Sequence, residues 1–177
     1  MRVIAGILRG KKLHVLKDDA VRPTTDKVKE SVFNIVQFEL QDKVFLDLFS
    51  GSGQMGIEAL SRGARHCFFV DHNKSAIKTI KQNLKSSNML EKAQIINKDA
   101  INFLVNTNEK FDIAFLDPPY KTGILQNALK NIFRKMNKNG IIICESPIEE
   151  SLDEFQNEFT ISKVYKYGQI KITVFRG

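Results

Sequence analysis

The sequence has no tryptophan, two cysteines and three histidines among its 177 residues. The cysteines, Cys67 and Cys144, form no Cys-x-x-Cys pair and fall in apolar runs, where a buried free thiol is the expected state. The histidines, His14, His66 and His72, lack the spacing of metal ligands. We therefore expect free thiols and no structural metal.

Long apolar runs are missing as well. No run approaches the roughly 20 residues that cross a bilayer, and the N-terminus lacks the apolar core and cleavage-like site of a secretory signal. The chain also has no internal repeat, low-complexity tract or flexible linker. Its length suits one domain with a sizeable core. We expect a single cytoplasmic domain over residues 1–177.

Acidic residues are absent from residues 1–17, although the whole chain has 20 against 27 lysines and arginines. The basic residues of this segment are Arg2, Arg9, Lys11, Lys12 and Lys17. Such a cluster suits a polyanion, and a solvated basic surface explains it equally well on charge alone. Loose alternation around two glycines predicts that residues 2–5 pair with residues 12–16. We expect residues 1–21 to form a basic N-terminal β-hairpin appendage.

From residue 44 onward, apolar runs alternate with amphipathic segments, as in a parallel sheet covered by helices. Parallel strands are expected at 44–49, 66–70, 93–97, 111–116 and 140–145, and helices at 55–62, 73–87, 100–105, 124–136 and 152–156. The final strands, 159–166 and 169–176, lie too close for a helical crossover and must form an antiparallel hairpin. The expected fold is α/β, a mostly parallel seven-stranded sheet with helices on both faces.

A further helix is expected directly after Pro23, before the first strand. Thr24, Thr25 or Asp26 can cap it. Its apolar face, at helical spacing, consists of Val28, Val32, Phe33, Ile35 and Val36. Lys27, Lys29 and Glu30 are expected elsewhere on the helix.

A glycine-rich turn follows the first expected strand. Residues 51–56 match G-x-G-x-x-G, and Asp71 lies about 20 residues beyond the first glycine, as in the dinucleotide fingerprint. Asp47 argues against NAD, because a carboxylate next to a pyrophosphate is repelled. It suits a ligand with a cationic group, and S-adenosylmethionine carries an ammonium and a sulfonium without phosphate. We therefore expect S-adenosylmethionine.

Acids also follow the next two strands. Asp71 can accept hydrogen bonds from both ribose hydroxyls, Asp99 can accept from the adenine amino group, and His72 can flank the adenine. Each acid alone could be a helix N-cap, the favoured reading for Asp99 alone. Together they lie where open α/β sheets bind ligands. The expected cofactor site is Asp47, Phe49, Gly51, Ser52, Gly53, Asp71, His72, Asp99 and Ala100.

The tetrapeptide Asp117-Pro118-Pro119-Tyr120 follows the fourth expected strand. The prolines stiffen the loop, and Asp117 with a neighbouring carbonyl can bind both hydrogens of an exocyclic amine. This aims the nitrogen lone pair at the methyl group, so positioning supplies most of the catalysis. Asp117 can then take the released proton, and Tyr120 can stack on the base. The alternative is a rigid turn capped by Asp117, with Tyr120 in the core.

Several motifs together resemble the RsmD family of bacterial 16S rRNA (guanine-N2)-methyltransferases. They are RVIAG at 2–6, RG at 9–10, RPT at 22–24, DKVKE at 26–30, FN at 33–34, DLFSGSG at 47–53, EALSRGA at 58–64, VD at 70–71 and DPPY at 117–120. The N-terminal motifs are the most specific, because many methyltransferases share the others. Lys27 and Lys29 replace the family's usual arginines, keeping charge for an RNA contact without bidentate phosphate binding. Asp71 replaces a frequent Glu.

The resemblance implies a Rossmann-like class I methyltransferase that uses S-adenosylmethionine to methylate one guanine N2 in 16S rRNA. Its substrate would be the assembled or partly assembled small ribosomal subunit, and the target base must leave its stack. Implied RNA contacts are Arg2, Arg9, Lys11, Lys12, Arg22 and Thr24. Arg22 and Thr24 could instead face the methionine end of the cofactor. We expect a monomer.

Three other functions compete with this reading. A DNA adenine-N6 methyltransferase can carry Asp-Pro-Pro-Tyr, but one helix between strands four and five leaves no room for a target-recognition region. An NAD-dependent oxidoreductase conflicts with Asp47 and needs a catalytic His or Tyr-Lys pair that the sequence does not supply. A non-catalytic RNA-binding module would not need the intact Asp117 loop.

Overall fold

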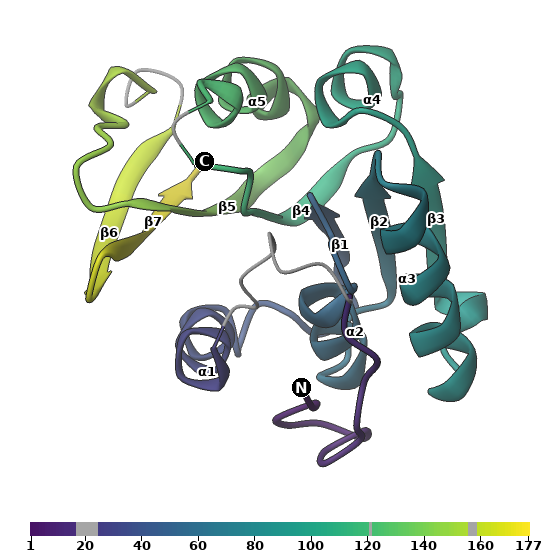
Figure 1. Ribbon diagram of the computed structural model, residues 1–177. Helices are drawn as coiled ribbons and strands as arrows, with labels where there is room; N and C mark the ends of the chain where they lie inside the picture. Colours follow the sequence, from purple (N-terminus) through teal and green to yellow (C-terminus); the bar gives the residue numbers. More distant parts are fainter. Residues whose placement is uncertain (17–24, 121, 156–158) are drawn as a thin grey trace.

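The computed structural model describes residues 1–16, 25–120, 122–155 and 159–177. At its centre lies a seven-stranded sheet in the order β3-β2-β1-β4-β5-β7-β6 (Figure 1). The strands are β1 Val44–Leu48, β2 His66–Asp71, β3 Ala93–Asn97, β4 Phe111–Leu116, β5 Met136–Pro147, β6 Thr160–Tyr167 and β7 Ile170–Arg176. β1 to β5 pair in parallel, whereas β7 runs antiparallel between β5 and β6. The predicted mostly parallel sheet with its C-terminal hairpin is confirmed.

Helices cover both faces of the sheet (Figure 1). They are α1 Asp26–Ile35, α2 Gln54–Ser61, α3 Lys74–Ser86, α4 Ala100–Asn106 and α5 Ile124–Ile132, with 3₁₀ turns η1 Leu90–Lys92, η2 Phe133–Lys135 and η3 Asp153–Phe155. Successive strand residues face opposite sides. Phe45 therefore packs with α1, α2 and α3, whereas Leu46 packs with α4 and α5. These two apolar layers hold the carboxyl ends of the parallel strands at one edge.

Two predicted boundaries differ from the structure near the carboxyl end. The helix expected over 124–136 ends at Ile132, continues as η2, and gives way to β5 at Met136. Met136 is buried and pairs with Phe111 of β4, so the strand starts before the apolar run that begins at Gly140. The helix expected over 152–156 is only the short turn η3, and residue 156 lies outside the described residues.

The N-terminal segment pairs with itself in antiparallel fashion, over a shorter stretch than its alternation predicted. Arg2 and Lys12 form a bridge, the Val3 N–H donates to the Lys11 carbonyl oxygen at 2.9 Å, and the Leu13 N–H donates to the Met1 carbonyl oxygen at 3.1 Å. Residues 17–21 of the expected hairpin lie outside the described residues. Val3 and Leu13 are buried in the main core. The segment is therefore packed into the core, and the expected appendage is corrected to an integrated element.

Contacts with α2 explain why this segment lies flat on the core. The buried carboxylate of Glu58 accepts hydrogen bonds from the backbone N–H groups of Ile4 at 2.8 Å and Ala5 at 3.0 Å. Gly6 has a left-handed φ of 80°, and a Cβ there would lie 1.9 Å from the Ser61 carbonyl oxygen. Only glycine allows this approach, so the turn packs directly on the α2 backbone.

Lys29 lies on the buried side of α1, which begins at the predicted cap Thr25. Its side chain is fully buried, and Nζ donates to the Arg2 carbonyl oxygen at 2.5 Å. Burial lowers the pKa of Lys29, although the nearby carboxylates of Glu58 and Asp26 oppose the shift. The expectation that Lys29 lies off the apolar face and can meet RNA is wrong. This lysine connects α1 to the N-terminal segment.

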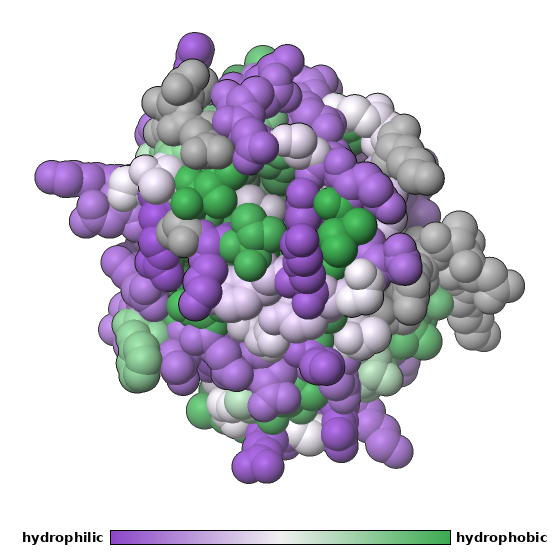
Figure 2. Space-filling model, turned by 90° about the vertical axis from the view of Figure 1, so that its left-hand side faces the viewer, coloured by the Kyte–Doolittle hydropathy of each residue, from purple (hydrophilic) through white to green (hydrophobic). Residues whose placement is uncertain are grey.

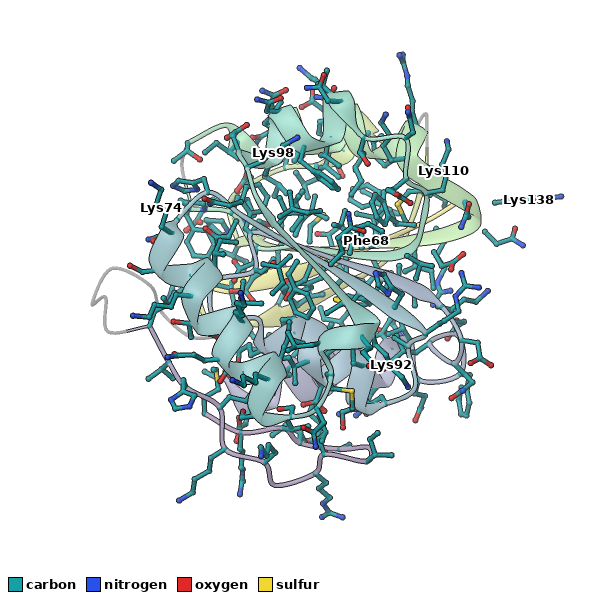
Figure 3. The ribbon with its side chains drawn as sticks, turned by 90° about the vertical axis from the view of Figure 1, so that its right-hand side faces the viewer. Phe68, Lys74, Lys92, Lys98, Lys110 and Lys138 are labelled. Carbon is teal, nitrogen blue, oxygen red and sulfur yellow. The ribbon has the colours of Figure 1, made fainter. Side chains whose placement is uncertain are left out.

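Charged side chains are spread over the surface. Hydrophilic atoms dominate the side of Figure 1 that carries β6, and apolar atoms form small groups among them (Figure 2). Exposed Lys163 and Lys166 lie on this edge strand, where charges disfavour edge-to-edge aggregation. On the opposite side, lysines from Lys74 to Lys138 are distributed widely (Figure 3).

None of the helices within the described ranges is long and apolar enough to cross a membrane.

Candidate active site

A cavity of about 870 Å³ opens at the carboxyl ends of the parallel strands. It is lined by the segments after β1, β2, β3 and β4, by Glu145 of β5, by the start of α1 and by the β6–β7 turn. Its volume lies within the range of roughly 300 to 1,000 Å³ typical of small-molecule sites. Its place is where open parallel sheets bind ligands.

The glycine loop and Asp71 form the wall at β1 and β2. Phe49 and Gly51, which both line the cavity, have left-handed φ values of 68° and 54°. The Gly51 N–H donates to Asp71 Oδ2 at 2.9 Å, and the Asn73 N–H donates to Asp71 Oδ1 at 2.8 Å. A carboxylate has about four acceptor positions. Asp71 is thus held by backbone donors and retains the capacity to accept from a vicinal diol.

The residues after β3 also reach the cavity. Asp99 caps α4, accepting from the Asn102 N–H at 2.9 Å, and lines the cavity together with buried Ala100. The capping function considered for Asp99 is therefore confirmed. His72 lines the mouth, with its side chain 78% exposed. These residues provide acceptors and a flat ring next to Asp71.

Three predicted cofactor residues do not reach the cavity lining. Among the described residues, Asp47, Ser52 and Gly53 do not line the cavity. Asp47 Oδ2 instead accepts from the Gly56 N–H at 2.9 Å. At Gly53, whose φ is 78°, a Cβ would lie 3.1 Å from Ile80. Asp47 and Gly53 therefore help to position the glycine loop, and direct contacts of Asp47, Ser52 and Gly53 with a cofactor stay a prediction.

The third glycine of the loop serves helix packing. A Cβ at Gly56 would lie 2.3 Å from the Phe69 ring and 2.6 Å from Cys67 Sγ. Glycine at this position therefore lets α2 pack closely on β2, as in nucleotide-binding folds. The Asp47 carboxylate that receives the Gly56 N–H is almost completely buried. Burial raises the pKa of Asp47 to about 8, with a smaller increase from Asp71, although the Gly56 hydrogen bond opposes the shift.

The raised pKa of Asp47 predicts a pH-dependent stability. An unfolded Asp ionises near pH 4, whereas folded Asp47 keeps its proton up to about pH 8. The folded state therefore binds the extra proton between these values, and stability falls by about 1.4 kcal/mol per pH unit. Asp47→Asn removes this titration. Urea unfolding from pH 5 to 8 should show the wild-type free energy of unfolding declining relative to that of the variant, whereas parallel curves would contradict the assignment.

Asp117, Pro118, Pro119 and Tyr120 all line the cavity on the β4 side. Burial raises the pKa of Asp117, and the negative charges of Glu145 and Asp47 raise it further. Tyr120 is 42% exposed, so the alternative that placed it in the core is wrong. Its hydroxyl donates to Glu145 Oε1 at 2.6 Å. The tetrapeptide thus presents a proton-accepting carboxylate and a tyrosine ring to the cavity.

The predicted RNA-binding arginines and lysines are not gathered at the cavity. Arg2, Arg9, Lys11 and Lys12 do not line it, and Arg2 Nε lies 3.4 Å from Asp26 Oδ2. Arg22 and Thr24 lie outside the described residues. No group of three or more His, Cys, Asp and Glu side chains in the described parts of the chain is arranged to hold a metal ion.

The whole chain matches known proteins. A family model described as Conserved hypothetical protein 95 matches residues 1–176. Ribosomal RNA small subunit methyltransferase D of Haemophilus influenzae is 33% identical over 99% of this chain and 93% of its own length. The chain belongs to the RsmD family. YlbH of Bacillus subtilis is 38% identical over 99% of this chain and 98% of its own length.

Solved structures share the fold of this chain. The protein yhhF of Escherichia coli has a TM-score of 0.88 and 29% identity, covering 99% of this chain and 97% of that chain. The T. thermophilus 16S rRNA N2 G1207 methyltransferase, solved with AdoMet and guanosine, has a TM-score of 0.76 over 92% of this chain and 45% of that chain. At 18% identity the second likeness concerns the fold alone. The predicted methyltransferase fold is confirmed.

Sequence reasoning missed two charged residues that line the cavity of this RsmD family member, Glu145 and Lys166. Glu145 follows an apolar run at the carboxyl end of a parallel strand, the same signal that identified Asp71, so it could have been found. Lys27 at the start of α1, whose charge was assigned to an RNA contact, also lines the cavity. Lys166 lies beside the β6–β7 turn, and its approach depends on β7 inserting between β5 and β6. Strand spacing along the sequence does not reveal that order.

Proposed function

We propose that the protein transfers a methyl group from S-adenosylmethionine to the exocyclic N2 of one guanine in 16S rRNA of the small ribosomal subunit. One observation carries the proposal: Asp71 on the β2 side and the Asp117 tetrapeptide on the β4 side line the same cavity. Donor and acceptor can therefore meet within it. Membership of the RsmD family and the guanosine bound by the T. thermophilus enzyme of the same fold support the guanine.

The cofactor half of the cavity fits S-adenosylmethionine. Its wall between β1 and β3 presents the carboxylates of Asp71 and Asp99, which suit hydroxyl and amino donors and repel a pyrophosphate. Gly51 lines the cavity where the ligand must approach backbone. We propose that Asp71 binds the ribose diol, that Asp99 and the Ala100 N–H bind the adenine, and that His72 covers it. The bound cofactor supplies an electrophilic methyl group.

The acceptor half of the cavity positions the amine and receives its proton. Asp117 accepts one hydrogen of the guanine N2 group and turns the nitrogen lone pair towards the methyl group. When the N–C bond forms and the methyl–sulfur bond breaks, the nitrogen becomes acidic. The raised pKa of Asp117 suits its carboxylate to take that proton or pass it to water. Tyr120 can stack on the base while its hydroxyl remains bound to Glu145.

RNA binding fits the charges around the cavity. Lys27 and Lys166 line it from α1 and from the β6–β7 hairpin, where they can contact phosphates beside the unstacked base. Because lysines that neutralise phosphates release counterions, binding should weaken with salt. We propose that one chain acts as a monomer in the cytoplasm on assembled or partly assembled small subunits. The particle then presents the base, and no separate recognition domain is needed.

The competing functions fit the cavity less well. The connection from β4 to β5 contains only α5 and η2 between the described strands, which leaves no target-recognition region for a DNA adenine-N6 methyltransferase. An NAD-dependent oxidoreductase would place pyrophosphate near the carboxylates of Asp71 and Asp99, which line the cavity. An RNA-binding module would not require a proton-accepting carboxylate inside the cavity.

Ligand titration tests the cofactor assignment. The protein should bind S-adenosylhomocysteine, and Asp71→Ala should weaken that binding by about 10-fold to 100-fold, because the diol loses charge-assisted hydrogen bonds. Isothermal calorimetry with NAD as the comparison ligand measures both affinities. Tighter binding of NAD would refute the assignment. Exposed Glu91, far along the chain from the glycine loop, offers Glu91→Ala as a control whose affinity should be unchanged.

A further inference from the structure

Glu145 lies beside Asp117 at the edge of the sheet. Leu116 of β4 pairs with Cys144 of β5 in parallel register, so the next residue on each strand is Asp117 and Glu145. Side chains at matched positions of neighbouring parallel strands point to the same face, and the strands lie about 4.8 Å apart. Both residues line the cavity, and the charge of Glu145 acts on Asp117. The acceptor half therefore presents two adjacent acceptors.

Tyr120 fixes the orientation of the second acceptor. Glu145 is only 6% exposed, and its Oε1 receives the Tyr120 hydroxyl at 2.6 Å. A short hydrogen bond to a buried carboxylate holds that group firmly. Because Tyr120 belongs to the same tetrapeptide as Asp117, the two carboxylates and the tyrosine form one unit whose parts are positioned together.

Two adjacent acceptors complement the Watson–Crick edge of guanine. Guanine presents two neighbouring donors there, the N2 amino group and N1–H, whereas adenine presents its amino group beside a bare N1 acceptor. We infer that Glu145 is a specificity-determining residue that accepts the N1–H of the target guanine while Asp117 accepts from N2. This inference rests on the proposed function. A base with an unprotonated N1 places a lone pair against the Glu145 carboxylate and is rejected.

Glu145→Gln should reverse this preference between the two bases, because it replaces an acceptor by a donor with little change in the shape of the side chain. The glutamine carbonyl can still accept from the Tyr120 hydroxyl, so its NH₂ group turns towards N1. This NH₂ donor faces another donor in the N1–H of guanine, which is unfavourable. It can donate a hydrogen bond to an N1 that carries no proton. The base 2-aminopurine keeps the 2-amino group and has a bare N1, so it separates recognition of N1 from recognition of N2.

The test compares both bases at the natural target. After wild-type methylation has located the target, small-subunit RNA carrying guanosine or 2-aminopurine riboside there is made by ligation and reassembled with small-subunit proteins. Wild type should prefer guanosine in kcat/KM by about 10-fold or more. In Glu145→Gln that ratio should fall to about one or below, with affinity for S-adenosylhomocysteine unchanged. The exposed Glu149, which does not line the cavity, gives the matched control Glu149→Gln, which should keep the wild-type ratio.

The outcomes separate the inference from the function on which it rests. Wild-type protein that forms no N2-methylguanosine refutes the proposed function. If the wild-type protein methylates guanine and Glu145→Gln has the same ratio of kcat/KM for guanosine and 2-aminopurine, the role of Glu145 is overturned and the proposed function stands. The same conclusion follows if Glu145→Gln lowers transfer to both bases equally. Tyr120→Phe removes the hydroxyl that orients Glu145 and should lower the ratio in the same direction. It provides the decisive comparison if Glu145→Gln does not fold.

Discussion

Asp117→Ala should lower kcat/KM for methyl transfer about 10³-fold or more, because it removes both the group that orients the amine and the group that takes its proton. The fold should persist. Asp117 is half-buried, and the negative charge of Glu145 acts on it, so removing the carboxylate relieves repulsion. The measurement is transfer of labelled methyl groups to small subunits, with affinity for S-adenosylhomocysteine and thermal unfolding recorded on the same protein.

Asp117→Asn separates the two functions of the side chain. Its amide oxygen still accepts from the amine, but it cannot take the proton. Burial and neighbouring acids raise the pKa of Asp117, so the wild-type rate should increase with pH as this carboxyl group loses its proton. The Asn variant should retain part of the activity and lose that pH dependence. Full activity in Asp117→Ala would remove Asp117 from the mechanism.

Glu58→Ala should cost about 3–5 kcal/mol of folding free energy, the range found when one member of a buried ion pair is removed. The Glu58 carboxylate is fully buried, accepts from the Ile4 and Ala5 N–H groups, and lies 2.8 Å from Arg62 Nε. Without it these donors lose their acceptor. Most small domains have only 5–15 kcal/mol of stability, so urea unfolding should show a large shift.

Amide hydrogen exchange locates the effect of Glu58. In Glu58→Ala the amides of Ile4 and Ala5 should lose protection first, because their acceptor is gone. Glu58→Gln retains one acceptor oxygen and should cost less. Glu91→Ala, at an exposed position of η1, should change stability by about 0.5 kcal/mol or less. If Glu58→Ala lowers the free energy of unfolding as little as Glu91→Ala does, the N-terminal segment is held by its apolar residues alone.

Periodicity predicted the sheet well because it is a local signal. Apolar runs and their spacing identified β3 and β4 at their observed bounds, and the short turn before β7 required an antiparallel hairpin. The acids at strand ends identified the correct edge of the sheet. Asp71, Asp99 and Asp117 do line one cavity.

The side on which a residue lies was harder to predict. Asp47 precedes the glycine loop. Strand alternation places its side chain on the face where its carboxylate accepts a hydrogen bond from the Gly56 N–H. The charge of Lys29 predicted a surface position. The residue is buried because its ammonium group donates a hydrogen bond to the backbone carbonyl of Arg2, which is distant in sequence. The pairing predicted for residues 2–5 with 12–16 is shorter in the structure, because Gly6 and Glu58 fix the segment to α2. These contacts join residues far apart in sequence, which local patterns do not report.

The most direct test of the proposed function is transfer of a labelled methyl group to small ribosomal subunits, followed by nuclease digestion and nucleoside analysis. The wild-type protein should place the label in N2-methylguanosine of 16S rRNA, and Asp117→Ala should place almost none. Label in N6-methyladenosine, or no transfer by wild-type protein that binds S-adenosylhomocysteine, would contradict the proposed function.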